Sequence, residues 1–314
     1  MRPVIIAHRG ASGHLPEHTL AGKALAYAMG ADYLEQDVVA TRDDELVVLH
    51  DIHLDRVTDV ARHFPKRARA DGRFYARDFD LAEIQTLRVH ERTDAEGNPV
   101  YAGRFHSAGE DFRVHTFERE LELVADLCEE GGRPVGIYPE IKHPAWHRAE
   151  GVDISPQMLE VLARFGYTDH GDPIYLQCFD ENELRRIRHD FGSELKLVQL
   201  IGEDDWSTEL TNFAGMRTQR GMNKLAQTVD AVGPWLNRLY RHRRKDGKNS
   251  PSGLVERAHS VGLAVHPYTF RLDDLPPGFA TFDELIRFCA RDLLVDGLFT
   301  DFPAAVSQLF RRIF

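Results

Sequence analysis

Two short apolar runs of this sequence end in side chains that could do chemistry. Val4–Ala7 is followed at once by His8 and Arg9, and the run Glu45–His50 closes on a histidine. A turn after a strand needs glycine or proline, which supply no reactive group. Imidazoles titrate near pH 6.5, so a pair of them can act as base and acid, while a guanidinium can hold an anion. We therefore predict that His8 and His50 are catalytic and that Arg9 binds an anionic group.

Carboxylates lie in two other strand-like runs, in a pattern that would bring them together. Glu35 and Asp37 are two residues apart, and so are Glu140 and Lys142. Residues two apart in a strand share a face, so each pair points the same way. Three converging carboxylates repel one another and lose hydration unless a cation joins them. Oxygen ligands suit Ca²⁺ or Mg²⁺ better than zinc, so we predict one divalent cation, with Ca²⁺ first and Mg²⁺ second, held by Glu35, Asp37 and Glu140.

Together these residue types describe the cleavage of a phosphate ester. Lys142, like Arg9, would hold phosphoryl oxygens. One histidine would activate the nucleophile and the other would protonate the leaving alkoxide. The alternative is a structural network in which the carboxylates only pair with Arg9 and Lys142. For Glu35 and Asp37 alone that alternative is the better interpretation, but Glu140, from a separate run, favours the metal.

The elements that must position these residues alternate between strand and helix. Apolar helical spacing follows several strand-like runs, a pattern typical of parallel βα units. We predict a (β/α)₈ TIM barrel, since a doubly wound sheet would carry a glycine fingerprint after its first strand. The candidate strands number nine, one more than a barrel needs: Val4–Ala7, Tyr33–Ala40, Glu45–His50, Val135–Lys142, Ile174–Phe179, Leu195–Ile201, Val229–Pro234, Leu263–Phe270 and Gly297–Phe302.

One long segment breaks this alternation. Residues 52–115, called the inserted segment below, are polar and rich in Arg, Asp and Gly, with one short helical pattern at Leu81–Leu87. A loop of this length in a compact domain is usually functional. We predict one catalytic TIM-barrel domain over residues 1–314, with the inserted segment capping its site. A second irregular stretch, Gly202–Arg220, is expected to lie on the same or a neighbouring loop.

Composition excludes several classes of protein. A formal net charge of −11 argues against a nucleic-acid binder, and the dense basic run Arg241–Lys248 is predicted to be a solvated loop. No apolar run approaches the roughly 20 residues of a membrane span. The three cysteines lie far apart, which suggests neither a zinc site nor a disulfide framework.

Seven segments, in order and across nearly the whole chain, resemble the glycerophosphodiester phosphodiesterases: HRGASGHLPEHT (8–19), EQDV (35–38), VVLHD (47–51), YPEIK (138–142), LQCF (176–179), VHPYT (265–269) and GLFTDFP (297–303). Their combination is highly specific, although each alone would be weak. The inserted segment is similar to the one that separates this family from related barrel phospholipases, in the version of its bacterial periplasmic branch.

The resemblance implies a TIM barrel, a Ca²⁺ or Mg²⁺ requirement and hydrolysis of glycerophosphodiesters, such as glycerophosphocholine or glycerophosphoethanolamine, to sn-glycerol 3-phosphate and an alcohol. It assigns the same catalytic, phosphate-binding and metal-binding residues as the reasoning above. Phe179 and Tyr268 would line the glycerol pocket, with a place in the core as the alternative. The chain departs from many members at His18, where they carry Asn, and at Tyr268, where they carry Trp. His18 is expected in the first turn of a helix, orienting its neighbours.

Other interpretations stay open at this point. The same barrel could host a lipase D-like enzyme acting on intact lipids, although such enzymes lack an insertion of this size, or a non-catalytic binding protein. The expected partner is a small molecule, and the sequence leaves open whether the chain forms a homodimer. No signal peptide is visible, so the expected location is the cytoplasm, or the periplasm if a leader has been removed.

Overall fold

The computed structural model describes residues 2–105, 111–206, 211–243, 245 and 247–314. Within them, eight parallel strands form a nearly closed barrel in the order β10-β7-β6-β5-β4-β2-β1-β11. Backbone bonds from Asp296 N to Val265 O and from Phe299 N to Pro267 O, each 3.0 Å, link the two ends of this sheet. The predicted TIM barrel is confirmed. Its strands are β1 (Val4–Ala7), β2 (Tyr33–Ala40), β4 (Gly136–Ile141), β5 (Leu176–Cys178), β6 (Leu197–Ile201), β7 (Ala231–Pro234), β10 (Ala264–Val265) and β11 (Gly297–Thr300).

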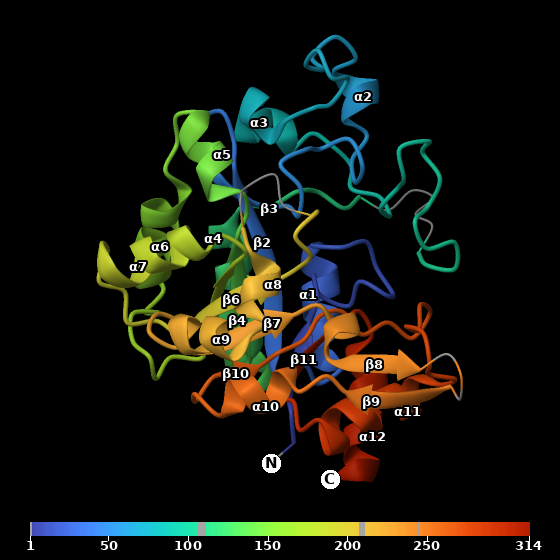
Figure 1. Cartoon of the computed structure of the whole chain (residues 1–314). Coiled ribbons are helices and arrows are strands. Elements are labelled where there is room, and N and C mark those ends of the chain that lie inside the picture. Colours follow the sequence, from blue (N-terminus) through green and yellow to red (C-terminus); the bar gives the residue numbers. More distant parts are fainter. Residues whose placement is uncertain (1, 106–110, 207–210, 244, 246) are drawn as a thin grey trace.

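Helices follow most barrel strands and pack against their outer faces (Figure 1). No helix in the described ranges is long and apolar enough to cross a membrane. The helices are α1 (Leu20–Ala28), α4 (Phe117–Gly131), α5 (Pro144–Ala149), α6 (Ile154–Arg164), α7 (Glu181–His189), α8 (Phe213–Met216), α9 (Gln219–Leu225), η2 (Leu236–Arg238), α10 (Leu254–His259), α11 (Phe282–Arg287), η3 (Phe288–Asp292) and α12 (Pro303–Ile313).

The candidate that does not belong to the barrel is the third along the chain, Glu45–His50. β3 (Leu46–Val48) pairs antiparallel with the far end of β2, with Val38 opposite Val48. A short antiparallel strand cannot be told from a parallel one by its apolar run alone, because both are buried. The run predicted over Leu263–Phe270 is also shorter than expected, since Pro267 has no N–H to continue the ladder of β10. Phe270 N instead donates to Phe299 O at 2.8 Å.

The inserted segment lies over the end of the barrel that is opposite to the two termini (Figure 1). It contains α2 (Val60–His63), η1 (Ala76–Asp78) and α3 (Leu81–Ile84). Its apolar side chains, among them Phe79 and Leu87, form a cluster with Val39 and Val47 of the β2–β3 pair. The segment is therefore anchored on one side of the barrel mouth by its own hydrophobic contacts.

The basic run is exposed at Arg241 and Arg243, as expected of a solvated segment, but it forms a hairpin and not the predicted loop. Arg241–Arg243 belong to β8 (Tyr240–Arg243), which pairs antiparallel with β9 (Lys248–Pro251). Tyr240 is buried against Phe279 and Phe288, which anchors the hairpin. The run carries polar residues on both faces, so it lacks the alternation of apolar and polar residues that indicates a strand. Residues 244 and 246 lie outside the described residues.

The barrel interior below the strand ends is apolar. Ile6, Tyr138, Val198, Ala231 and Phe299 fill it as a small cluster of buried side chains. His266, which directly follows β10, lies at this level and not in the cavity above: its Nδ1 is 2.8 Å from the Tyr138 hydroxyl. A filled floor means that ligands can reach the strand ends only from the side of the inserted segment.

A buried ion pair supports β2 from behind. Lys23 of α1 and Glu120 of α4 are both inaccessible, with Nζ 2.6 Å from Oε1. Lys23 also donates to the backbone oxygen of Glu35, and Glu120 accepts from Gln36 and His115 at 2.9 and 2.8 Å. Burial opposes the charge of Glu120, but Lys23 and His115 outweigh it and lower its pKa to about 2.

Glu120→Gln should destabilise the fold strongly. Glutamine keeps the shape but leaves the Lys23 ammonium buried without a countercharge, which costs about 3–5 kcal/mol. Urea unfolding followed by circular dichroism measures the loss. Glu122→Gln, on the exposed side of the same helix, is the matched control and should change the free energy of unfolding little. Equal effects of the two substitutions would contradict this account.

A second buried group ties stability to pH. His147 is fully buried: its Nδ1 lies 3.1 Å from His143 O and its Nε2 accepts from Ala40 N at 3.1 Å. Burial lowers the pKa of His147 to about 4, so the folded chain resists a proton that the unfolded chain takes up near pH 6.5. Stability is therefore complete above pH 6.5 and falls as the pH drops toward 4.

His147→Gln should flatten this dependence. Glutamine can accept from Ala40 and donate to His143 without titrating, which removes a contribution of about 3 kcal/mol between pH 6.5 and 4. Urea unfolding of both proteins at several pH values gives the two slopes. Parallel slopes for the variant and the parent would show that His147 is not a source of the acid sensitivity.

Candidate active site

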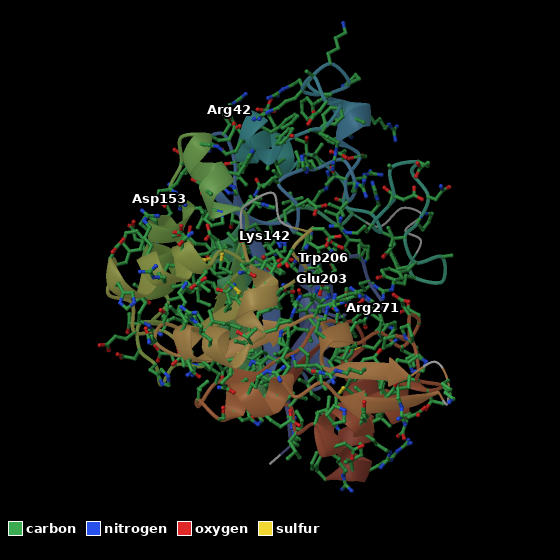
Figure 2. The ribbon with its side chains drawn as sticks, viewed as in Figure 1. Arg42, Lys142, Asp153, Glu203, Trp206 and Arg271 are labelled. Carbon is green, nitrogen blue, oxygen red and sulfur yellow. The ribbon has the colours of Figure 1, made fainter. Side chains whose placement is uncertain are left out.

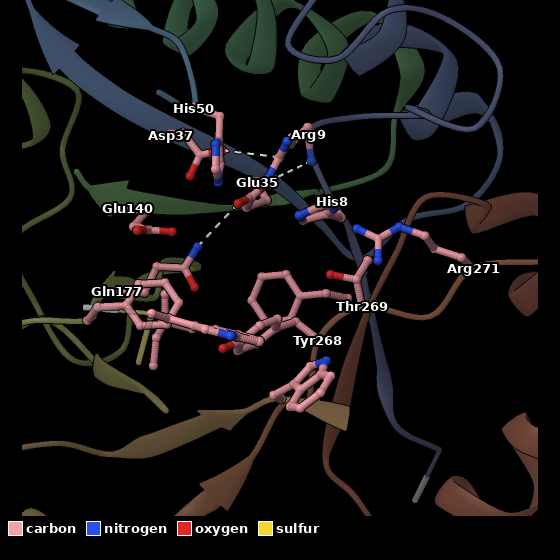
Figure 3. Close-up of a pocket in the computed structure, with 15 residues that line it drawn as sticks. His8, Arg9, Glu35, Asp37, His50, Glu140, Gln177, Tyr268, Thr269 and Arg271 are labelled. Atoms are coloured by element: carbon pink, nitrogen blue, oxygen red, sulfur yellow. Dashed lines mark hydrogen bonds and ion pairs between the residues drawn. The ribbon is translucent and has the colours of Figure 1, made fainter. Parts of the chain in front are cut away.

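Strand register brings the predicted acidic residues to one level of the barrel. Asp37 of β2 lies opposite Glu140 of β4, and Glu140 lies opposite Gln177 of β5. Their side chains point into a cavity of about 230 Å³ at the strand ends (Figure 3). The cavity is lined by His8, Arg9, Glu35, Asp37, His50, Glu140, Gln177, Phe179, Leu200, Trp206, Trp235, Tyr268, Thr269, Arg271 and Phe299.

The carboxyl groups of Glu35, Asp37 and Glu140 are buried, and they repel one another when they are charged. Burial and the Asp37 carboxylate raise the pKa of Glu35 well above its usual range. Burial also raises the pKa of Glu140, to about 8, although Lys142 works against it. Burial opposes the charge of Asp37 too, but Lys142, His50 and His18 outweigh it and hold its pKa well below normal. The protein alone therefore leaves this cluster short of positive charge.

The donor set fits a metal ion. Ligand atoms of His18, Glu35 and Asp37 lie within 4.8 Å of one another, and all three residues are buried. Asp37 Oδ1 is buried without a hydrogen-bond partner, which is costly for a carboxylate oxygen. A dication would satisfy that oxygen and relieve the repulsion. Glu140 faces the same cavity, with Lys142 Nζ 2.7 Å from its Oε1 and 3.6 Å from Asp37 Oδ1.

His18 lies just before helix α1, not in its first turn as expected. Thr19 is the N-cap, accepting from Gly22 N, and His18 precedes it with a left-handed φ of 57°. Its Nε2 is 2.7 Å from Asp37 Oδ2. Arg9 shares the left-handed conformation, and its oxygen accepts from His18 N at 3.0 Å. Such backbone costs about 1–3 kcal/mol per residue, so the two strained positions beside the acidic cluster mark a functional site.

Both predicted catalytic imidazoles are tethered in the same way. His8 Nδ1 is 2.6 Å from Asp301 Oδ1, and His50 Nδ1 is 2.6 Å from Asp51 Oδ1. The pKa values of both aspartates are lowered, so these groups are carboxylates and can only accept. Each Nδ1 must then carry the proton, which leaves each Nε2 with a lone pair. Burial and the neighbouring Arg9 lower the pKa of His8 to about 4 and of His50 to about 3.

The two predicted phosphate-binding cations sit beside the acidic cluster. Arg9 N donates to Glu35 Oε2 at 2.5 Å, and its guanidinium is 2.9 Å from Glu17 Oε2 and 3.5 Å from Asp37 Oδ2. Burial works against the charge of Lys142, but Glu140 and Asp37 outweigh it and raise its pKa. Lys142 lines an adjoining cavity of about 330 Å³ that shares His50, Glu140 and Phe179 with the first.

An aromatic wall faces this polar side. Phe179 and Tyr268 meet edge to face at 6.0 Å, and the Tyr268 hydroxyl donates to Ile201 O at 3.2 Å. The ring centres of Trp206, labelled in Figure 2, and Trp235 lie 4.9 Å apart, and Trp206 is half exposed. Phe179 and Tyr268 both line the cavity, and their contact with glycerol stays a prediction. The cavity has one charged and one apolar side, which suits a ligand with an anionic and an apolar part.

A model of the glycerophosphoryl diester phosphodiesterase family matches residues 8–305 of this chain. The chain belongs to that family. A glycerophosphodiester phosphodiesterase of Haemophilus influenzae is 43% identical over 328 residues, covering 99% of this chain and 90% of the relative. The chain is thus a phosphodiesterase of glycerophosphodiesters, as its sequence predicted.

Solved structures agree on the fold of the family. A crystallised protein from Silicibacter pomeroyi DSS-3 has a TM-score of 0.73 at 23% identity, covering 99% of this chain and 94% of its own. An Oleispira antarctica phosphodiesterase, in complex with the product sn-glycerol-3-phosphate, has a TM-score of 0.65 at 19% identity, covering 99% and 97%. At these identities the likeness shows the barrel alone.

Sequence reasoning about this phosphodiesterase left several cavity residues without a role. Asp301 and Gln177 end strands and carried a positional signal, but nothing in the sequence paired Asp301 with His8. Arg271, Trp206 and Trp235 lie in connections without periodicity, so no pattern pointed to them. Part of the stretch around Trp206, residues 207–210, lies outside the described residues.

Proposed function

We propose that this chain hydrolyses glycerophosphodiesters such as glycerophosphocholine or glycerophosphoethanolamine to sn-glycerol 3-phosphate and an alcohol, with one divalent cation, Ca²⁺ before Mg²⁺. The observation that supports it best is the meeting of two neutral imidazoles with a buried acidic cluster in one cavity. The Oleispira antarctica structure holds sn-glycerol-3-phosphate, which is the product that the proposed reaction would release.

The histidines supply the proton transfers in this proposal. Hydrolysis consumes one water in total and breaks the P–O bond to the alcohol. The Nε2 lone pair of one ring takes the proton of the oxygen that attacks phosphorus, because its neutral form dominates at pH 7. The other ring must be protonated to serve the leaving oxygen. A bound phosphodiester brings a negative charge beside it and raises its pKa.

The cations hold the phosphoryl group. Arg9 and Arg271 supply positive charge to the catalytic cavity, and Lys142 supplies it to the adjoining cavity. Glu35, Asp37 and Glu140 are the proposed metal ligands, and His18 holds the second oxygen of Asp37. When bound, the ion would neutralise phosphoryl oxygens as a Lewis acid. Phe179 and Tyr268 would pack against the carbon atoms of the glycerol.

Purified protein with Ca²⁺ should release sn-glycerol 3-phosphate from glycerophosphocholine, and EDTA should stop the reaction. His8→Ala and His50→Ala should each lower kcat by about 10²–10⁴, the usual worth of general acid–base catalysis. A coupled assay for glycerol 3-phosphate measures both. Full activity in EDTA would remove the metal from the proposal, and turnover of intact lipids alone would favour a lipase D-like enzyme instead.

Calorimetric titration with Ca²⁺ tests the ligand set without relying on activity. Asp37→Asn and Glu140→Gln should each weaken Ca²⁺ binding by at least 10-fold, whereas His18→Ala, which only loses an orienting partner, should weaken it less. Asp153→Asn, an acid paired with Arg186 away from the cavity, is the control and should bind normally (Figure 2). Loss of binding in His18→Ala with normal binding in Glu140→Gln would place the ion among His18, Glu35 and Asp37.

A further inference from the structure

Each catalytic imidazole is connected to the inserted segment through one aspartate. Asp51 and Asp301 hold the Nδ1 atoms of His50 and His8, as described above. The second oxygen of each accepts from an arginine of the inserted segment, Arg92 at Asp51 and Arg104 at Asp301. The inserted segment thus contacts, at two separate residues, the two aspartates that hold the imidazoles.

In the first arm, Arg92 holds Asp51 from the far side. Arg92 Nη1 is 2.6 Å from Asp51 Oδ2, while its Nε and Nη2 are 2.8 and 2.7 Å from the two oxygens of Glu17. The arginine and Glu17 are largely buried, at 15% and 10% side-chain exposure. The two hydrogen bonds to Glu17 fix the plane of the Arg92 guanidinium, and Nη1 is then directed at Asp51.

In the second arm, Arg104 holds Asp301. Arg104 Nη2 is 2.7 Å from Asp301 Oδ2, and its Nε is 2.8 Å from Asp273 Oδ2. The Arg104 side chain is 5% exposed, and its guanidinium lies 3.8 Å from the centre of the Tyr101 ring. Arg271, from the barrel, donates to the same Asp301 oxygen at 2.8 Å.

We propose that Arg92 and Arg104 are positioning residues, through which the inserted segment fixes the orientation and tautomer of both catalytic imidazoles. The inference rests on the proposed function of His50 and His8. Neither ring lies in a strand: His8 follows β1, with its N still donating to Thr300 O at 3.0 Å, and His50 lies two residues after β3, so the ladder does not set the rotation of either ring. An aspartate held by one hydrogen bond can rotate, whereas one held from both sides presents its oxygen to Nδ1 in a single direction.

Both arms also border a second cavity. This cavity, of about 180 Å³, adjoins the catalytic cavity and shares His8, Arg9, His50 and Arg271 with it, and Arg92 and Arg104 are among its lining residues. The inserted segment thus contacts the site as one of its walls. Movement of this segment would displace both imidazoles together.

Two esters of sn-glycerol 3-phosphate test the inference, the choline ester and the p-nitrophenyl ester, whose leaving group needs no proton. Arg92→Gln and Arg104→Gln should each lower kcat for the choline ester by about 10–100-fold. In one arm the loss should shrink with the p-nitrophenyl ester, because that arm positions the histidine that protonates the leaving oxygen. In the other arm the loss should persist with both esters.

Arg69→Gln is the matched control. Arg69 is an arginine of the same segment with two acidic partners, Asp78 and Glu150, and it contacts neither Asp51 nor Asp301. Its kcat should equal that of the parent for both esters. The parent rate tests the proposed function, while the ratio of variant to parent tests this inference, so the two fail separately. Unchanged kcat in both arms, or equal losses with both esters in both arms, would overturn it.

Asp51→Asn and Asp301→Asn keep the inference testable if an arginine variant does not fold. They change the same hydrogen bonds without removing a buried cation, and each should lower kcat as its arginine variant does. Nitrogen-15 NMR of the imidazoles gives a second readout that does not depend on turnover. The parent should show protonated Nδ1 in both rings, and each arm's variants should lose that tautomer in one ring only. Unaltered tautomers in folded variants would count against the inference.

Discussion

The meeting of three buried carboxyl groups at the ends of neighbouring strands is the constraint on which this structure depends. Barrel register puts Asp37 beside Glu140, and the two-residue period puts Glu35 on the same face as Asp37. A slip of one residue would turn all of them into the helix layer, where Gln36 now contacts Glu120. The apolar pattern that fixes the register thus also fixes the electrostatic strain of the site.

Nearby cationic side chains compensate the charge of these carboxyl groups, and Arg9 among them is itself paired with a further acid. Lys142 is shared by Glu140 and Asp37, and Arg9 is shared by Glu17 and Asp37. Glu17 in turn holds Arg92 of the inserted segment. A chain of buried ion pairs therefore runs from the barrel strands to the segment above them. Removing one member leaves its partner charged and unpaired, so the site is held together as a unit.

Periodicity made part of this site predictable from the sequence. Glu35, Asp37 and Glu140 lie in strands, where spacing fixes the face of each side chain, and His8 and His50 directly follow strand-like runs. The antiparallel pairing of β3 was not predictable, because burial makes both kinds of strand apolar. Arg92, Arg104 and Trp206 were missed for another reason. They lie in connections, where neighbours in space are set by tertiary packing and not by any repeat in the chain.

This division has a physical cause. A strand residue is oriented by its ladder, so an acid in β2 or β4 needs no further support to face the cavity. Beyond a strand end little of that restraint is left, a single backbone bond to Thr300 O in the case of His8, and a histidine ring adds its own rotation. Orientation of His8 and His50 must then come from side chains that reach them from elsewhere, which in this molecule are aspartates backed by arginines. Periodicity in the sequence therefore predicts which way the acids face. The side chains that orient the imidazoles can be identified only from the folded structure, in which the inserted segment packs on the barrel.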